Sequence, residues 1–208
     1  MTNILWFFDF ISPFAYLQAE RLGDLTASVT PKPVLFAGLL KHWGHLGPAE
    51  IPAKRLFTYR HVLWLAQKHG IPMKLPPAHP FNPLKLLRLC LACENRLEAV
   101  SAIFRFVWRD GGDVENPAQL AALAHGLGAE PFPDCLQDPH VKRQLIQNGE
   151  DAKALGLFGV PSLVIDGELF WGFDATEMVG DYLADPNLLS RGEMARVNAL
   201  PIGTARPK

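Results

Sequence analysis

The sequence predicts an α/β fold in which a small mixed sheet is covered by helices and a long helical segment is inserted after the second strand. Three observations predict it: an apolar run that leads directly into a helix near the N-terminus, a middle segment with helical periodicity alone, and a β-hairpin followed by a helix. With 208 residues, of which 49% are hydrophobic, the chain is long enough for one domain that carries a large insertion.

The first unit is organised around residues 5–16, LWFFDFISPFAY. The apolar run at residues 4–10 predicts a buried strand, and the spacing of the apolar residues after it predicts a helix from residue 13 to about residue 29. A second apolar run at residues 34–40, introduced by two prolines, predicts the second strand. Strand, helix and strand at this spacing are typical of a βαβ unit with a parallel sheet.

The middle of the chain shows only helical periodicity. A helix is predicted at residues 53–69, and the proline-rich segment 76–83 (PPAHPFNP) is predicted to be an ordered loop, because proline suits neither a helix interior nor a central strand. The other predicted segments are a loop at residues 41–52 and helices at residues 84–109, with a break near Asn95, 117–127 and 138–157.

The C-terminal part returns to short strands after Val160-Pro161. Strands are predicted at residues 162–166 and 168–171, joined by Asp166-Gly167, which is a strong signal for a two-residue hairpin turn. Asp174 is predicted to cap a last helix that continues to residue 182.

The resulting order of elements is that of a thioredoxin-like fold interrupted after its second strand. Residues 1–40 and 158–184 are predicted to form this discontinuous domain, and residues 41–157 a helical insertion domain that covers it as a lid. Residues 185–208 show little periodicity and are predicted to form a C-terminal tail on the surface.

Composition excludes several classes of function. The formal net charge is -1 and the basic residues are scattered, so the sequence shows no footprint for nucleic acid or for an acidic membrane surface. The apolar N-terminal run has no basic leader and no small-residue cleavage site, which favours a core strand over a signal peptide, and no transmembrane span is predicted. Three cysteines without a disulfide framework indicate a reducing compartment, so a cytoplasmic protein is expected.

The most informative residue is Ser12, at the junction between the first strand and the first helix. It stands where an N-cap belongs, with Pro13 at the first helical position, and a capping role alone would explain it. In a thioredoxin-like layout, however, a redox Cys-x-x-Cys would occupy this turn, whereas the chain has Ser12-Pro13-Phe14-Ala15. The turn keeps a helix N-terminus that favours anions but has no sulfur of its own, so we infer that a bound cofactor supplies a thiolate.

Two C-terminal segments are candidates for holding such a cofactor. Val160-Pro161 lies where thioredoxin-like folds place a cis peptide, which leaves the Val160 backbone groups free to pair with an extended peptide; a trans proline opening a strand is the alternative. Gly172, Phe173 and Asp174 offer amides and a carboxylate for the charged groups of a γ-glutamyl moiety. An ordinary helix start is the alternative for this second segment.

The cysteines and histidines indicate no metal or redox site of their own. Cys90-Leu91-Ala92-Cys93 is a literal Cys-x-x-Cys, but it lies inside a leucine-rich helical segment, so both thiols are interpreted as core residues. The seven histidines show no metal-ligand spacing, and no metal site is predicted. Only His45 and His42, which lie in or beside a glycine-containing loop, are expected to face the site.

Three stretches together resemble the 2-hydroxychromene-2-carboxylate isomerases: FDFISPFAYL, GIP with the following PPAHPFNP, and LFGVPSLVIDGELFWGFD. These enzymes belong with the kappa-class glutathione transferases in the DsbA-like thioredoxin superfamily. The resemblance extends to about Leu183, and the Ser-Pro turn is specific in combination with GVPS and WGFD. It implies a homodimer, glutathione as the cofactor and a small substrate from aromatic compound catabolism.

The resemblance also implies roles for individual residues. Ser12, beside Pro13 and Phe14, would hold the sulfur of glutathione as a thiolate. Val160 would pair with the cysteinyl backbone, and residues 172–174 would hold the γ-glutamyl end. Family members usually have Gly-Asn after the second strand, where this chain has Gly44-His45. The residues expected near the glycyl end or the substrate are His45, His42, Lys54, Phe81 and Asn82.

The reaction implied is a cis–trans isomerisation between 2-hydroxychromene-2-carboxylate and trans-o-hydroxybenzylidenepyruvate, in which the thiolate adds reversibly to the conjugated side chain and allows rotation. Ser12 would act as an electrostatic stabiliser and not as the attacking group. Three alternatives stay open: a kappa-type transferase that releases a conjugate, a non-catalytic module that binds thiol peptides, and, least favoured, a disulfide oxidoreductase that uses Cys90 and Cys93.

Overall fold

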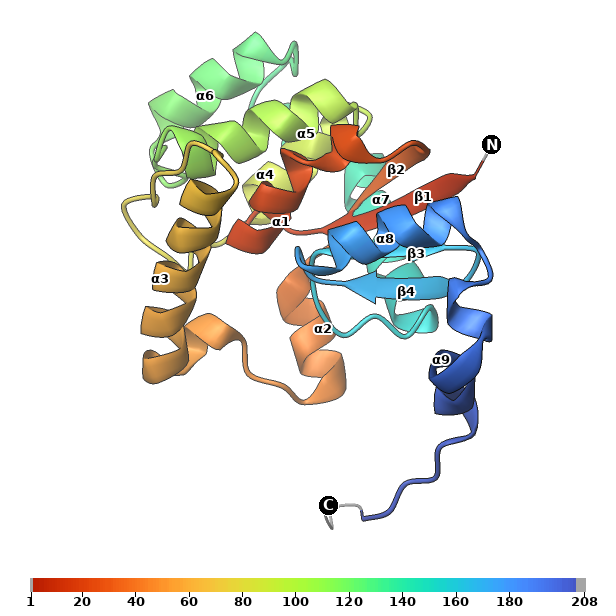
Figure 1. Ribbon diagram of the computed structural model, residues 1–208. Helices are drawn as coiled ribbons and strands as arrows, with labels where there is room; N and C mark the ends of the chain where they lie inside the picture. Colours follow the sequence, from red (N-terminus) through yellow and green to blue (C-terminus); the bar gives the residue numbers. More distant parts are fainter. Residues whose placement is uncertain (1, 205–208) are drawn as a thin grey trace.

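The computed structural model describes residues 2–204 and confirms the predicted α/β fold (Figure 1). One mixed sheet has the strand order β2-β1-β3-β4, in which β1 is parallel to β2 and antiparallel to β3, and β3 is antiparallel to β4. The strands are β1 (Asn3–Phe8), β2 (Ser28–Pro33), β3 (Ser162–Ile165) and β4 (Glu168–Trp171). The two central strands therefore come from opposite ends of the chain.

Helices surround this sheet, and most of them lie between β2 and β3 in the sequence. They are α1 (Pro13–Ala19), α2 (Phe36–Trp43), α3 (Pro52–Lys68), α4 (Leu84–Ala92), α5 (Leu97–Phe104), α6 (Pro117–Gly126), α7 (Pro139–Ala154), α8 (Ala175–Ala184) and α9 (Gly192–Arg196), with a π-helical turn (Arg105–Arg109) after α5. Figure 1 shows α3, α4, α5 and α6 gathered to one side of the sheet, away from β4 and α9.

Strand β1 carries the centre of the core because its side chains alternate between two buried faces. Trp6 and Phe8 lie in the larger core, where their ring centroids are 4.3 Å apart and both rings pack near Phe104 of α5. Phe7 lies on the opposite face, in a smaller core that includes Leu39 of α2. Burial on both faces fixes the register of β1. It therefore also fixes the position of the turn that follows β1.

The second strand lies earlier than the sequence predicts. The predicted strand at residues 34–40 is wrong, because β2 occupies Ser28–Pro33 and most of the apolar run belongs to α2. β2 tolerates its two prolines because it is an edge strand. The amide of Val34 donates to the Phe8 carbonyl of β1 at 2.9 Å. Successive residues of a strand face opposite sides, so the nitrogens of Pro31 and Pro33 face the open edge, where no hydrogen bond is needed. A short apolar run fits a buried helix as well as a strand, which explains the error.

Two other boundaries differ from the prediction. Helix α1 ends at Ala19 instead of near residue 29, and a 3-10 turn (Leu22–Asp24) follows it. The chain must leave the helix there because β2 begins at residue 28. The predicted loop at residues 41–52 is partly helical, since α2 continues to Trp43 and α3 begins at Pro52.

Three other local predictions agree with the structure. The helical break near Asn95 separates α4 from α5. The proline-rich segment 76–83 forms neither helix nor strand. Asp166 and Gly167 join β3 to β4 with φ values of 52° and 88°, the positive values that a tight hairpin turn needs.

Beyond α8, the predicted tail contains α9 and short 3-10 turns, and its last residues, 205–208, lie outside the described part of the chain. Among residues 2–204, no helix combines the length and apolar character needed to cross a membrane. The division of the chain near residues 41 and 157 stays a prediction. Helix α7 nevertheless packs on the sheet, where the Asn148 amide donates to the Pro33 carbonyl at 2.9 Å.

Candidate functional site

The turn between β1 and α1 places Ser12 at the N-cap of α1, as the sequence predicts. Its backbone is extended, with φ of -88° and ψ of 114°, and its Oγ accepts a hydrogen bond from the Ala15 amide at 3.2 Å. Pro13 occupies the first helical position. The Ser12 side chain can therefore satisfy a helix amide and still retain its own proton as a donor.

Ser12 lies next to Val160, although the two residues are far apart in the sequence. The Ser12 hydroxyl donates to the Val160 carbonyl at 3.5 Å, and the Val160-Pro161 peptide is cis, as predicted. A distance of 3.5 Å is long for an O–H···O bond, so this contact is weak. The hydroxyl proton of Ser12 and the carbonyl of Val160 are thus both available to a stronger partner.

The peptide group between Ile11 and Ser12 is held from both sides. The Ser12 amide donates to the Asp9 carbonyl at 3.0 Å, and His79 Nε2 lies 2.8 Å from the Ile11 carbonyl. Because a carbonyl only accepts, Nε2 must carry the proton. The Tyr59 hydroxyl then has two acceptors for its one proton, His79 Nδ1 at 2.7 Å and the His79 carbonyl at 2.9 Å. Burial lowers the pKa of His79, which favours this neutral form.

A second contact from the helical segment supports the same turn. Trp108, in the π-helical turn, donates its indole N–H to the Phe10 carbonyl at 2.8 Å. The rings of His79 and Trp108 pack edge to face with centroids 5.3 Å apart. Sequence reasoning missed Tyr59, His79 and Trp108. The rigid segment PPAHPFNP was a signal for His79, but nothing in the sequence pairs it with α3 or with the π-helical turn.

Asp9 links the end of β1 to the start of α2. Its side chain is fully buried, and its two oxygens accept from the Phe36 amide at 2.8 Å and the Ile11 amide at 3.2 Å. Burial raises the pKa of Asp9 to about 7, although the backbone hydrogen bonds act in the opposite direction. Asp9, the one acid in residues 5–16, thus fixes the loop that carries Ser12.

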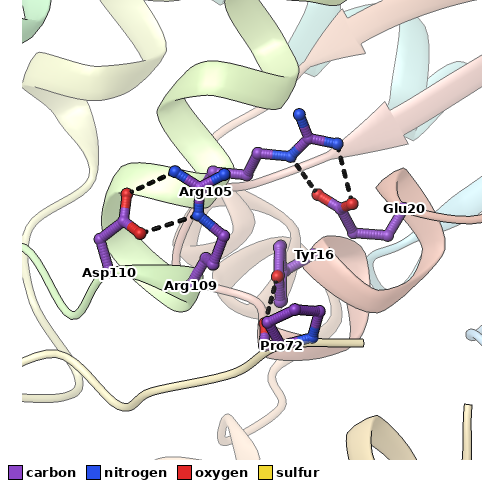
Figure 2. A network of polar contacts seen from close by, with 6 residues as sticks. All are labelled: Tyr16, Glu20, Pro72, Arg105, Arg109 and Asp110. Carbon is purple, nitrogen blue, oxygen red and sulfur yellow. Dashed lines mark hydrogen bonds and ion pairs between the residues drawn. The ribbon is translucent and has the colours of Figure 1, made fainter. Parts of the chain in front are cut away.

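Helix α1 is anchored to the helical segment on the side shown in Figure 2. The Tyr16 hydroxyl donates to the Pro72 carbonyl at 2.5 Å, and Arg105 binds the Glu20 carboxylate with two hydrogen bonds of 2.7 and 2.9 Å. Arg109 lies beside Arg105 and pairs with its own neighbour in the sequence, Asp110. Burial raises the pKa of Tyr16 to about 12, so its hydroxyl remains a donor. These contacts hold α1 in place behind Ser12.

The segment before α8 is bound to α1 through Gln18. The Gln18 amide donates to the Gly172 carbonyl at 3.1 Å and to Thr176 Oγ1 at 2.9 Å, while its oxygen accepts from the Trp6 indole at 2.8 Å. Gly172 has φ of +97°, and a Cβ there would meet the Asp174 carboxylate at 2.5 Å. A glycine is therefore required at this position.

Two details of the predicted γ-glutamyl segment need correction. The Gly172 amide is not free, because it donates to the Pro161 carbonyl at 2.9 Å. Asp174 stands at the N-cap of α8 but its side chain makes no capping hydrogen bond. Its φ and ψ are helical, a backbone that does not aim the carboxylate at the first amides of the helix. The Asp174 side chain is exposed, and Phe173 is buried with its ring 5.1 Å from the His69 ring.

The predicted residues around the glycyl end and the substrate are spread over three elements. His42 lies in the last turn of α2, His45 just after it, and Lys54 in the first turn of α3; all three are exposed. Asn82 lies just before α4, and its side-chain oxygen accepts from the Leu84 amide at 3.1 Å. Phe81 is half-buried, with its ring 5.8 Å from the His79 ring.

The structure also reveals an exposed aromatic surface that sequence reasoning missed. Phe57, His61 and Trp64 of α3 follow each other on one helix face, and their rings are stacked with centroids 5.5 and 6.1 Å apart. Phe57 is 65% exposed and Trp64 is 54% exposed. The His61 ring lies 6.0 Å from the ring of Phe14, which follows the Ser12 turn. We call these residues of α3 the aromatic face. The i, i+4, i+7 spacing was the available signal.

The literal Cys-x-x-Cys lies at the C-terminal end of α4, and both thiols are core residues, as expected. Cys90 and Cys93 are buried, and burial raises the pKa of both thiols. Within residues 2–204, no group of three or more histidine, cysteine or acidic side chains is arranged to bind a metal ion. Around the Ser12 turn, the structure places a hydroxyl beside the Val160 carbonyl and the aromatic face beside Phe14. The exposed Asp174 carboxylate lies before α8.

Comparison with known proteins agrees with this architecture. A model of the DSBA-like thioredoxin domain family matches residues 3–184. The chain is 26% identical over 193 residues to a 2-hydroxychromene-2-carboxylate isomerase from Sphingobium xenophagum, which covers 88% of this chain and 98% of that protein. It is 27% identical over 207 residues to a glutathione S-transferase kappa 2 from Caenorhabditis elegans, with 88% and 92% covered. The solved structure of a 2-hydroxychromene-2-carboxylate isomerase has a TM-score of 0.77 at 21% identity and covers 95% of this chain and 98% of that one.

Proposed function

The chain belongs to the DSBA-like thioredoxin family, and on this basis we propose that it is a glutathione-dependent isomerase. The proposed reaction interconverts 2-hydroxychromene-2-carboxylate and trans-o-hydroxybenzylidenepyruvate or a related aromatic catabolite. The observation that carries the proposal is the contact between Ser12 and Val160: a hydroxyl, not a thiol, stands at the turn, beside a carbonyl that a peptide can pair with. Such a turn can activate a thiol that it does not itself contain.

The groups around the turn fit glutathione. Ser12 retains a donor for a sulfur anion, the Val160 carbonyl is an acceptor with only a long contact, and the exposed Asp174 carboxylate suits an α-amino group. Pro13, Phe14, Phe173 and the Gly172 segment would form the walls around it, and His45 would contact the glycyl end. When bound, glutathione supplies the thiolate that adds reversibly to the conjugated side chain of the substrate.

The residues of the chain then have separate tasks. Ser12 holds the negative charge at the sulfur by hydrogen bonding, which favours ionisation of a thiol whose free pKa is ~8.5. Asp9 and His79 keep the Ile11–Ser12 peptide in one orientation, so the hydroxyl needs no reorganisation when the reaction proceeds. A hydroxyl that is already oriented toward the sulfur lowers the barrier of the reaction, because no free energy is spent on orienting it.

An aromatic substrate has a surface to bind beside the turn. The aromatic face of α3 is exposed, and its His61 ring is in contact range of Phe14. Stacking on such rings would orient a planar substrate, and Lys68, which lies over the Trp64 ring at 5.3 Å, would attract a carboxylate. His42, Lys54, Phe81 and Asn82 stay candidates for the remaining substrate contacts.

A kappa-type glutathione transferase is the second candidate, favoured by the 27% identity to a glutathione S-transferase kappa 2. The two functions are separated by incubating the protein with 2-hydroxychromene-2-carboxylate and following both isomer formation and free thiol. An isomerase requires reduced glutathione but leaves the thiol concentration unchanged, whereas a transferase consumes one thiol for each turnover. Binding of glutathione without either reaction would leave the non-catalytic thiol-peptide module.

We also infer a cytoplasmic homodimer. The cytoplasmic location is supported by three free cysteines, and the dimer rests on the family resemblance alone. Light scattering of the purified protein, with a mass of 23.0 kDa per chain, gives the oligomeric state directly.

A further inference from the structure

A concave site lies between α2, α4 and α7, and it shares no residue with the Ser12 turn or the aromatic face. Its volume is about 330 Å³, at the lower end of the range for small-molecule sites. The lining is mainly aliphatic and contains no aromatic ring: the apolar side chains are Leu35, Leu39, Leu84, Leu145 and Ile146. We call this site the α2–α4–α7 groove.

Two glycines keep the groove open. Gly38 of α2 and Gly149 of α7 both line it, and a Cβ built at either position meets no atom within 4 Å. Neither glycine has a positive φ, so backbone conformation does not require it. Glycine is also a poor helix former, so these positions weaken their helices without a conformational reason. What the two glycines provide is space between the helices.

The polar lining of the groove is cationic. It consists of Arg88 from α4 and Lys142, Lys153 and Glu150 from α7. Lys153 pairs with Glu150 at 2.8 Å, which neutralises that pair and leaves Arg88 and Lys142 as the uncompensated charges of the lining. An anion is therefore the complementary ligand for this end of the groove.

The guanidinium of Arg88 is not fully paired within the protein. Its Nε is buried and makes no hydrogen bond to the described residues. Buried donors in folded proteins almost always have a partner, and an unmet donor on a charged group is especially unfavourable. A carboxylate is the acceptor that matches a guanidinium best, because it can take two parallel hydrogen bonds.

We propose that the α2–α4–α7 groove is a binding site for an aliphatic carboxylate. The carboxylate binds Arg88 and Lys142, and the hydrocarbon chain lies against Leu39, Leu145 and Ile146. The aliphatic lining distinguishes this ligand from an aromatic substrate on the aromatic face. The proposal is independent of glutathione and of the isomerase reaction.

Calorimetric titration of the purified protein with sodium octanoate tests the proposal, with octanamide as the uncharged analogue. Gly149→Leu fills the groove, and Arg88→Met keeps the side-chain stem but removes the guanidinium. Gly180→Leu in α8 is the matched control, because Gly180 is also a helical glycine with no atom within 4 Å of its added Cβ, but lies outside the groove. Circular dichroism checks the folding of each variant, and Lys142→Met replaces Arg88→Met if the latter does not fold.

The expected result is saturable binding of one octanoate per chain. The affinity for octanoate falls by at least about tenfold in Gly149→Leu and in Arg88→Met, and it stays unchanged in Gly180→Leu. For Arg88→Met, this is the loss expected for one charge-assisted hydrogen bond. Octanamide binds the wild type at least about tenfold more weakly than octanoate. The proposal is overturned if octanoate does not bind the wild type or if Gly149→Leu binds octanoate as tightly as the wild type does. It is also overturned if the wild type binds octanamide as tightly as octanoate. Light scattering of the same variants shows whether a second copy of the chain covers the groove instead, which would also overturn it.

Discussion

Two four-residue motifs in this chain occupy opposite ends of helices, and they have opposite chemical character. Ser12-Pro13-Phe14-Ala15 begins α1 with Ser12 as the N-cap, whereas Cys90-Leu91-Ala92-Cys93 ends α4 with Cys93 as the C-cap. A helix N-terminus stabilises a negative charge and a C-terminus opposes it. Burial also raises the pKa of both cysteines. The motif with sulfur therefore disfavours a thiolate, and the motif without sulfur is arranged to accept one.

The difference shows that position in the fold decides the chemistry, rather than the presence of a reactive atom. The backbone of the Ser12 turn is held by hydrogen bonds to the Asp9 carbonyl and to the side chains of His79 and Trp108. The cysteine motif is surrounded by core side chains and has no such arrangement of donors and acceptors around an accessible point. Four changes test this contrast.

Replacing Ser12 by alanine is expected to have the largest effect. Glutathione-dependent turnover should fall by about 10²–10³-fold, the usual result of removing one donor to a developing negative charge. The free energy of unfolding should fall by about 1 kcal/mol through loss of the cap. Asn116→Ala is the control, because Asn116 caps α6 in the same way but lies elsewhere. If both variants lose turnover equally, Ser12 is only a cap.

Replacing His79 by leucine should lower kcat by about tenfold, because one hydrogen bond that orients the Ile11–Ser12 peptide is lost. The KM for glutathione should change little. His79→Gln should recover activity, since its amide can donate to the Ile11 carbonyl. A fall in thermal stability without a fall in kcat would show that His79 is merely structural.

Asp9→Asn is expected to change how stability depends on pH. The folded-state pKa of Asp9 is about 7, raised by burial from 3.8, so between these values the folded protein binds a proton that the unfolded chain has released. Its contribution to stability is complete below about pH 4 and is lost as pH rises to 7, by up to about 1.4 kcal/mol per pH unit. Urea unfolding across this range should show that slope in wild type and not in Asp9→Asn. Asp181→Asn, exposed on α8, should keep it.

Cys90→Ala should have the smallest effect. The change removes one buried sulfur atom, so the free energy of unfolding should fall by only about 1 kcal/mol, and turnover should be unaffected. Urea unfolding and the isomerase assay measure the two quantities. Loss of insulin-reducing activity in this variant would contradict the contrast, because it would show that the buried motif exchanges disulfides.

Local signals in the sequence were enough for most of the fold. Asp166-Gly167 predicts the hairpin because its two positive φ values suit these residues, and Val160-Pro161 was correctly predicted to be cis. The second strand was misplaced because the apolar run at residues 34–40 belongs mostly to α2. These residues are apolar because they pack in the core, and not because they pair in the sheet. The prolines of β2 are tolerated only at an edge, and a single sequence does not reveal which strand is at the edge.

The site was predictable only where chemistry and chain position coincide. Ser12 was found because it stands at a strand-to-helix junction, and the structure brings it to Val160. His79 and Tyr59 were missed because their contact with Ile11 depends on how a loop and α3 dock onto the sheet. Long-range docking of this kind leaves no periodic pattern. The aromatic face was missed for the same reason, because its place beside Phe14 depends on how α3 docks next to α1.

The most direct test of the central claim is a pH titration of glutathione bound to the protein, followed by the ultraviolet absorbance of the thiolate. Wild type, Ser12→Ala and Asn116→Ala are compared at saturating protein. The account predicts a thiol pKa clearly below the free value of ~8.5 in wild type and Asn116→Ala, and a return toward that value in Ser12→Ala. A bound thiol that titrates like free glutathione in the wild type, or equally low pKa values in all three proteins, would contradict it.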